Sequence, residues 1–140
     1  MRGDPVGIAS LRFRGDGMTA ETFMLVGRIV FGGFFLIAGI RNFAAIKERF
    51  TTSVTNYGWL LPAPLVAVGF AMQVVGGLSL MFGMWIVWGA LVLIAFTVMA
   101  TSLFHNLFMF QGKERDPHLY LTLVNITLCG GLLMVIAGAM

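Results

Sequence analysis

The chain has 140 residues, of which 59% are hydrophobic and 11% are charged. A typical soluble domain is about 45–50% apolar and about 25% charged, so too few polar groups are present here to cover a water-exposed surface. The net charge is only +3 and the Lys and Arg residues are scattered, which argues against a nucleic-acid partner. One cysteine, Cys129, excludes an internal disulfide and a CxxC site, and we expect no metal site. The composition predicts a small integral membrane protein.

Residues 1–21 are polar and rich in glycine, and we expect a flexible tail without a cleavable signal peptide. Thr19 is the expected N-cap of the first helix, and Glu21 lies in its first turn. A spanning helix needs about 20 mostly apolar residues. The sequence contains four apolar runs of about this length, so it predicts four spanning helices. They are Phe23–Ile40, Ala63–Phe82, Met84–Leu107 and Leu119–Met140.

Three connections separate the expected spans. The longest covers residues 41–62, and its first part, 41–50, either continues the first helix or lies in the membrane interface. The second is a tight turn near Gly83, because one continuous helix over 63–107 would overshoot a bilayer. The third covers 108–118 and contains a charged run that we expect Pro117 to stop. This places both termini and Gly83 on one side, and both long loops on the other.

The distribution of Lys and Arg gives a weak orientation. Arg2, Arg12 and Arg14 lie on the terminal side, whereas the loops carry Arg41, Lys47, Arg49, Lys113 and Arg115. The positive-inside rule therefore leans toward cytoplasmic loops.

Small residues recur on one face of the first two spans. Gly32 and Gly39 share a face with Arg28 in the first span, and Gly69, Gly76 and Gly77 line the face of the second. Glycines allow another helix to approach closely, so we interpret these residues as helix-packing positions. Arg28, about two turns from the terminal side, is also placed to snorkel toward headgroups.

Five polar side chains have depths that place them in the loop-side half of the bundle: Arg41, Gln73, His105, Asn106 and Asn125. Polar groups at membrane depth usually face the bundle interior and often mark function, so this group is our candidate ligand-binding site. The alternative is that the amides only form hydrogen bonds between helices, for about 0.6 kcal/mol each. No carboxylate lies in a span, and His118, expected in the loop, makes a haem held by two histidines improbable.

The pattern resembles the DoxX family of small bacterial membrane proteins over residues 22–137. The resemblance is carried by segments in three regions of the chain: Gly27–Phe31 with Ile37–Phe43, Leu60–Pro64 with Gln73–Gly83, and Ala100–Phe108 with Asn125–Leu133. It implies an all-α membrane four-helix bundle over residues 22–140. Two positions depart from the family pattern, because Gln73 stands where glutamate is common and Val124 where lysine is common.

The resemblance also implies a role, since some members are linked to quinone-dependent oxidation of sulfur compounds or to membrane oxidoreductase complexes. We therefore expect a multi-pass subunit of the bacterial inner membrane, associated with a quinone-linked oxidoreductase or respiratory complex. A quinone is the expected ligand, with no covalently bound cofactor and no assigned catalytic residue. The two missing charges weaken inherited redox chemistry and favour an accessory role.

Two alternatives remain at this point. One is a purely structural subunit that packs in a larger membrane complex, and the other is a small-solute transporter that works as an oligomer. In each case the partners are membrane lipids and either a larger membrane complex or further copies of the chain.

Overall fold

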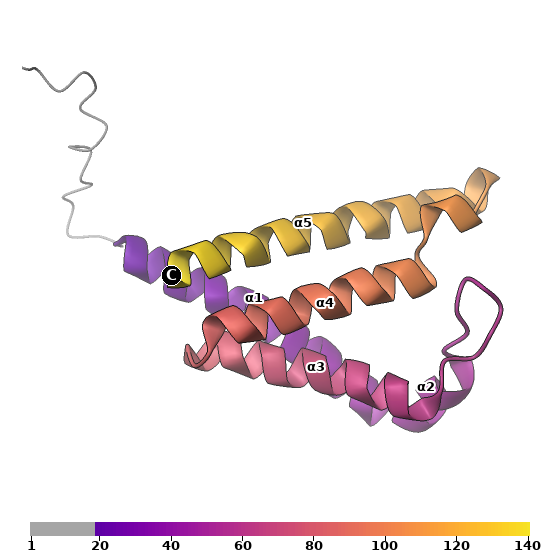
Figure 1. Ribbon diagram of the computed structural model, residues 1–140, viewed down its shortest axis with the longest axis horizontal. Coiled ribbons are helices and arrows are strands. Elements are labelled where there is room, and N and C mark those ends of the chain that lie inside the picture. The colour runs from indigo at the N-terminus through magenta and orange to yellow at the C-terminus, as the bar shows by residue number, and fades with distance from the viewer. Residues whose placement is uncertain (1–18) are drawn as a thin grey trace, which may run out of the picture.

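The computed structural model describes residues 19–140, and this part of the chain forms a bundle of helices (Figure 1). Four helices are long and apolar enough to cross a membrane, which confirms the predicted all-α membrane bundle. A short helix, α2, follows the first of them. The bounds are α1 Ala20–Ala44, α2 Ile46–Thr52, α3 Ala63–Phe82, α4 Ile86–Phe104 and α5 Arg115–Ala139. Of the expected polar tail, residues 1–18 lie outside the described residues, and residues 20 and 21 already belong to α1.

α1 begins as its sequence predicts and ends later. The Thr19 hydroxyl accepts a hydrogen bond from the Thr22 amide at 3.3 Å, which caps the first turn. The helix then continues past Ile40 to Ala44, and α2 starts after a single intervening residue, Ala45. The first part of the long connection is therefore helical, and α2 brings its charged residues to the loop-side end of the bundle.

The link between α3 and α4 is a tight turn, as predicted. Gly83 ends α3 in the left-handed conformation, with φ of 71°, and its amide donates to the Ser79 carbonyl. An L-residue is strained in this conformation, whereas glycine adopts it freely. Two residues later Trp85 precedes α4, so the chain reverses within three residues.

α5 begins earlier than predicted: the expected loop over 108–118 ends before Arg115, and Pro117 does not delay the start of the helix. Arg115 is its first residue, so Pro117 occupies the third helical position. Proline is tolerated in a first helical turn because the amide it lacks has no intrahelical partner there. As a consequence His118 is part of a helix and not of a loop. Two short 3₁₀ turns, Leu107–Met109 and Gly112–Glu114, connect α4 to it.

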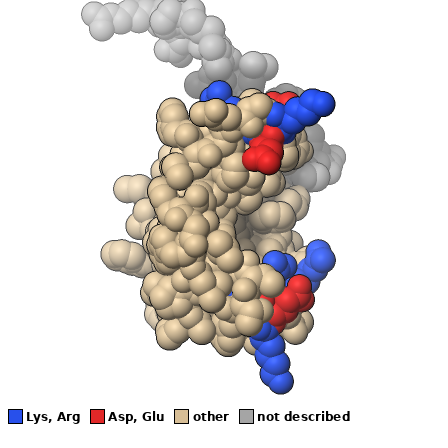
Figure 2. Space-filling model, turned by 90° about the vertical axis from the view of Figure 1, so that its right-hand side faces the viewer, with Lys and Arg blue, Asp and Glu red and all other residues tan. Residues whose placement is uncertain are grey.

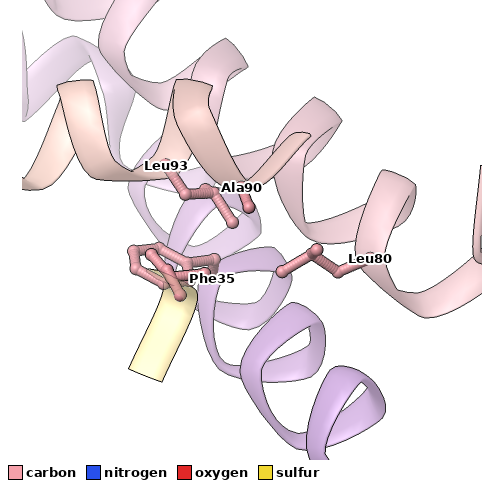
Figure 3. Close-up of a cluster of buried hydrophobic side chains, with 5 residues drawn as sticks. Phe35, Leu80, Ala90 and Leu93 are labelled. Atoms are coloured by element: carbon pink, nitrogen blue, oxygen red, sulfur yellow. The ribbon is translucent and has the colours of Figure 1, made fainter. Parts of the chain in front are cut away.

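The buried core lies nearer the terminal side. Phe35 of α1, Leu80 of α3, and Ala90 and Leu93 of α4 converge there, with Leu132 of α5 against them (Figure 3). Gly138 lies against the Met24 side chain, so the last turn of α5 and the start of α1 are on the same side of the bundle, as predicted. From their turn on that side, α3 and α4 diverge toward the loop side (Figure 1).

Candidate functional site

The diverging halves of α3 and α4 border a cavity of about 510 Å³. This volume falls in the range of about 300–1,000 Å³ that is usual for small-molecule sites. The walls are mostly apolar: α3 contributes Phe70 and Met72 among others, and α4 contributes Phe96, Ala100 and Phe104. α2 and the segment that follows it line the loop-side end of this half-open cavity. An apolar molecule can therefore be held between the two helices.

The polar lining of the cavity lies at its loop-side end. Asn42 of α1, Arg49 of α2 and His105 after α4 supply its main hydrogen-bonding side chains, next to the hydroxyls of Thr52 and Ser53. Among residues 19–140, which the structure describes, no carboxylate and no thiol lines the cavity. The arrangement is thus suited to binding a molecule with an apolar body and a polar, hydrogen-bond-accepting end.

Asn42 is held by the amide of Gln73. Its Nδ2 donates to Oε1 of Gln73 at 3.0 Å, between α1 and α3. Gln73 is only 6% exposed, so this pair is an interhelical hydrogen bond in a buried position. The predicted site residue Gln73 is therefore placed behind the lining residue Asn42. Sequence reasoning did not single out Asn42, although it lies three residues after Gly39, on the same face of α1.

His105 forms a direct contact with His118. Their Nδ1 atoms are 3.0 Å apart, and the His118 ring stacks on Phe110 with centroids 3.7 Å apart and an interplanar angle of 9°. The Thr122 hydroxyl lies 3.0 Å from the His105 carbonyl and 2.7 Å from that of His118. The expectation that His118 lies apart in a loop is wrong, because α5 starts three residues before it. Two nitrogens in hydrogen-bond contact still leave no room for a haem between the rings.

The other predicted site residues lie elsewhere. Asn125 donates to the Thr101 hydroxyl at 2.8 Å and lines a separate groove of about 470 Å³ between α4 and α5. Asn106 caps a 3₁₀ turn by accepting from the Phe108 amide at 3.1 Å, and its Nδ2 lies 3.3 Å from the Tyr57 hydroxyl. Arg41 is exposed in the last turn of α1. Of the five candidates, His105 alone lines the cavity directly.

The glycines among the helix-packing candidates lie where α3 meets α1 and α4. A Cβ on Gly77 would be 2.7 Å from the carbonyl oxygen of Gly32, so α1 and α3 approach backbone to backbone at this point. Gly39 meets Val74 of α3 in a similar way, and Gly76 meets Leu93 of α4. Gly69 is further from its neighbour, with a Cβ position 3.4 Å from the Phe96 ring. α3 and α4 are thus closest at Gly76, away from the cavity, and are further apart at Gly69, which lines it.

Arg28 lies at the opposite end of the bundle from the cavity. Its guanidinium is next to Gly83, at the carboxyl end of α3, where the helix dipole is negative and favours a cation. Its Nε is buried without a hydrogen-bond partner among the described residues. Arg28 therefore lies against the α3–α4 turn and does not line the candidate site.

On the face of the loop-side end, charged side chains lie toward two opposite edges (Figure 2). Figure 2 views this end and shows two groups of them, one over the start of α5 and one over α2, with uncharged surface between them. Of the charged residues in the described part of the chain, Arg49 of α2 is the one that lines the cavity. An acceptor group entering the cavity consequently meets a positive charge at its loop-side end.

The comparison with known proteins agrees with this architecture. The family model named DoxX matches residues 23–106. The chain belongs to the DoxX family. The match spans α1 to α4 together with His105 and Asn106, and it ends before α5. No curated protein and no solved structure matches the chain significantly.

Proposed function

We propose that this DoxX protein binds a quinone headgroup in the cavity between α3 and α4, as a subunit of a quinone-linked oxidoreductase in the bacterial inner membrane. The observation that supports the proposal most is the cavity itself, with apolar walls and its main hydrogen-bonding groups gathered at one end. Ligand sites of this kind combine a predominantly apolar lining with a few placed polar groups.

The chemistry of a quinone fits this division. Its two carbonyl oxygens accept hydrogen bonds, and its ring and isoprenoid tail are apolar. His105 and Arg49 can donate to a carbonyl at the loop-side end, while Phe70, Phe96 and Phe104 offer aromatic surface to the ring. The tail would leave between α3 and α4 into the bilayer, which is where a membrane-soluble ligand arrives.

The proposed role is that of a binding subunit, because the described residues that line the cavity include no redox-active group. Electrons would reach the quinone from a partner protein. A feature of α5 supports such a partner: only Leu132 of its 25 residues is buried, so most of the helix is free to contact lipid or protein.

A cavity-filling substitution tests the proposal. Ala100 lines the cavity on α4, whereas Ala95 lies on the same helix, is exposed and does not line it. Ala100→Phe should fill the space for the quinone ring and weaken the binding of decylubiquinone to the detergent-solubilised protein by about tenfold or more, equivalent to about 1.4 kcal/mol. Ala95→Phe should bind like the wild type. No binding by the wild type, or equal binding by both variants, would reject the proposal.

A purely structural subunit is the second candidate, and the sparse burial of α5 favours it as well. The two roles differ in what accompanies the protein after mild-detergent purification. A structural subunit retains its partner proteins and carries no quinone, whereas the proposed subunit carries both. Mass spectrometry of proteins and lipids in the same preparation distinguishes them.

A further inference from the structure

We propose that His118 is a positioning residue for the quinone site: its Nδ1–H donates to Nδ1 of His105 and thereby holds the His105 ring with its other nitrogen, Nε2, as a donor toward the cavity. The inference rests on the proposed function, and it assigns α5 a part in a site to which that helix contributes no lining residue. It starts from the distance of 3.0 Å between the two Nδ1 atoms.

A single proton lies between these two nitrogens. A neutral imidazole carries one N–H, so in a hydrogen bond between two Nδ1 atoms one ring donates and the other accepts. If His105 accepts at Nδ1, its proton is on Nε2, and the bond made by one nitrogen thus determines the state of the other. Since His105 lines the cavity and its Nδ1 is occupied by His118, Nε2 is the nitrogen left for a ligand.

The chemistry of the ligand selects the direction of this bond. A quinone carbonyl accepts hydrogen bonds and donates none, so His105 must present an N–H to it. This requires His118 to be the donor in the pair. With the opposite direction, Nε2 of His105 would be a bare acceptor facing a carbonyl oxygen, and two acceptors repel each other.

His118 is itself held from two directions. Its ring stacks on Phe110 with an interplanar angle of 9°, which fixes the plane of the imidazole. The Thr122 hydroxyl reaches the carbonyls of both His105 and His118, which ties the end of α4 to the first turns of α5. A ring fixed in this way holds its neighbour at a defined angle, which pre-organises the donor for the ligand.

Two substitutions at His118 separate positioning from packing. His118→Phe keeps an aromatic ring to stack on Phe110 and removes both nitrogens, whereas His118→Gln restores an amide donor. We expect the first to weaken decylubiquinone binding about three- to tenfold, as for a lost neutral hydrogen bond, and the second to recover most of the affinity. His105→Ala combined with His118→Phe should bind no more weakly than His105→Ala alone, because His118 acts through His105.

Nitrogen NMR of the histidines at about pH 8, where free imidazoles are neutral, provides the second measurement. We expect the wild type to show the His105 proton on Nε2, and His118→Phe to show a mixture of tautomers. Wild-type affinity in His118→Phe together with weakened binding in His105→Ala would overturn the inference and leave the proposed function standing. A His105 proton found on Nδ1 would also overturn it. Absence of quinone binding by the wild type would instead reject the proposed function.

Discussion

Three side chains from three elements meet at the loop-side end of the cavity, and each is held differently. Asn42 is fixed by Gln73 across the α1–α3 interface, and His105 is fixed by His118 of α5. Arg49 is exposed on the short helix α2. Partly buried hydrogen bonds hold two of the three groups in place without a ligand, which lowers the cost of ordering them around one.

The positions of His105 and Asn125 lead to different expectations for their substitution. His105→Ala removes a donor from the cavity, so decylubiquinone affinity should fall about three- to tenfold. Asn125→Leu alters the separate groove between α4 and α5 and should leave this affinity unchanged. A binding titration of both variants, with melting temperatures as a folding control, checks the prediction. Loss of affinity in Asn125→Leu alone would place the ligand in the other groove, and equal loss in both variants with lowered melting temperatures would reflect unfolding.

Sequence reasoning found part of this end of the cavity. His105 and Gln73 were recognised because hydropathy reveals the depth of a residue within a span. Arg49 and His118 were missed as site residues because their positions relative to the cavity depend on where the helices α2 and α5 begin. Those starts follow from tertiary packing and from a proline that the first turn of α5 tolerates.

At the scale of elements, glycines set where the helices touch and where they separate. α1 and α3 meet at Gly32 and Gly77, where each backbone occupies the space that the other's Cβ would need. Periodicity predicted the faces that carry these glycines, since a helix repeats every 3.6 residues. Periodicity did not predict which helices pack together, because a helix face made of small residues can pack against any neighbouring helix.

Substitution of Gly77 should destabilise the bundle. Gly77→Leu forces α1 and α3 apart, and overpacking of this kind typically costs about 1–3 kcal/mol. Gly33 is the matched control, because a Cβ at that position meets no atom within 4 Å. Thermal unfolding in detergent should show a lower melting temperature for Gly77→Leu than for Gly33→Leu. Similar melting temperatures for the two variants would contradict the close approach of the helices.

At the scale of the whole molecule, an even number of spans sets the topology. The four apolar runs could be read directly from the sequence, because a bilayer requires a minimum length of apolar helix. The loose packing of α5 could not be predicted from the sequence, since hydropathy does not distinguish a lipid-facing helix from one that packs in a bundle. The loop-side charges lie at the same end as the polar lining of the cavity, so the polar end of the site lies toward one membrane surface (Figure 2).

The topology can be tested by accessibility labelling in a Cys129→Ala background. Thr19→Cys and Met140→Cys should react from one side of the membrane, and Lys47→Cys and Lys113→Cys from the other. The positive-inside rule orients the second pair toward the cytoplasm. Labelling of Thr19→Cys and Met140→Cys from opposite sides would contradict four spans.

The central claim is that the cavity between α3 and α4 holds a quinone, and the quinone content of the gently purified protein tests it most directly. An organic extract of the wild type should contain a membrane quinone in roughly stoichiometric amount, quantified by mass spectrometry against protein. The extract of Ala100→Phe, purified in parallel and shown to be folded, should contain much less, whereas that of Ala95→Phe should match the wild type. A wild type without quinone, or equal quinone in all three preparations, would contradict the claim.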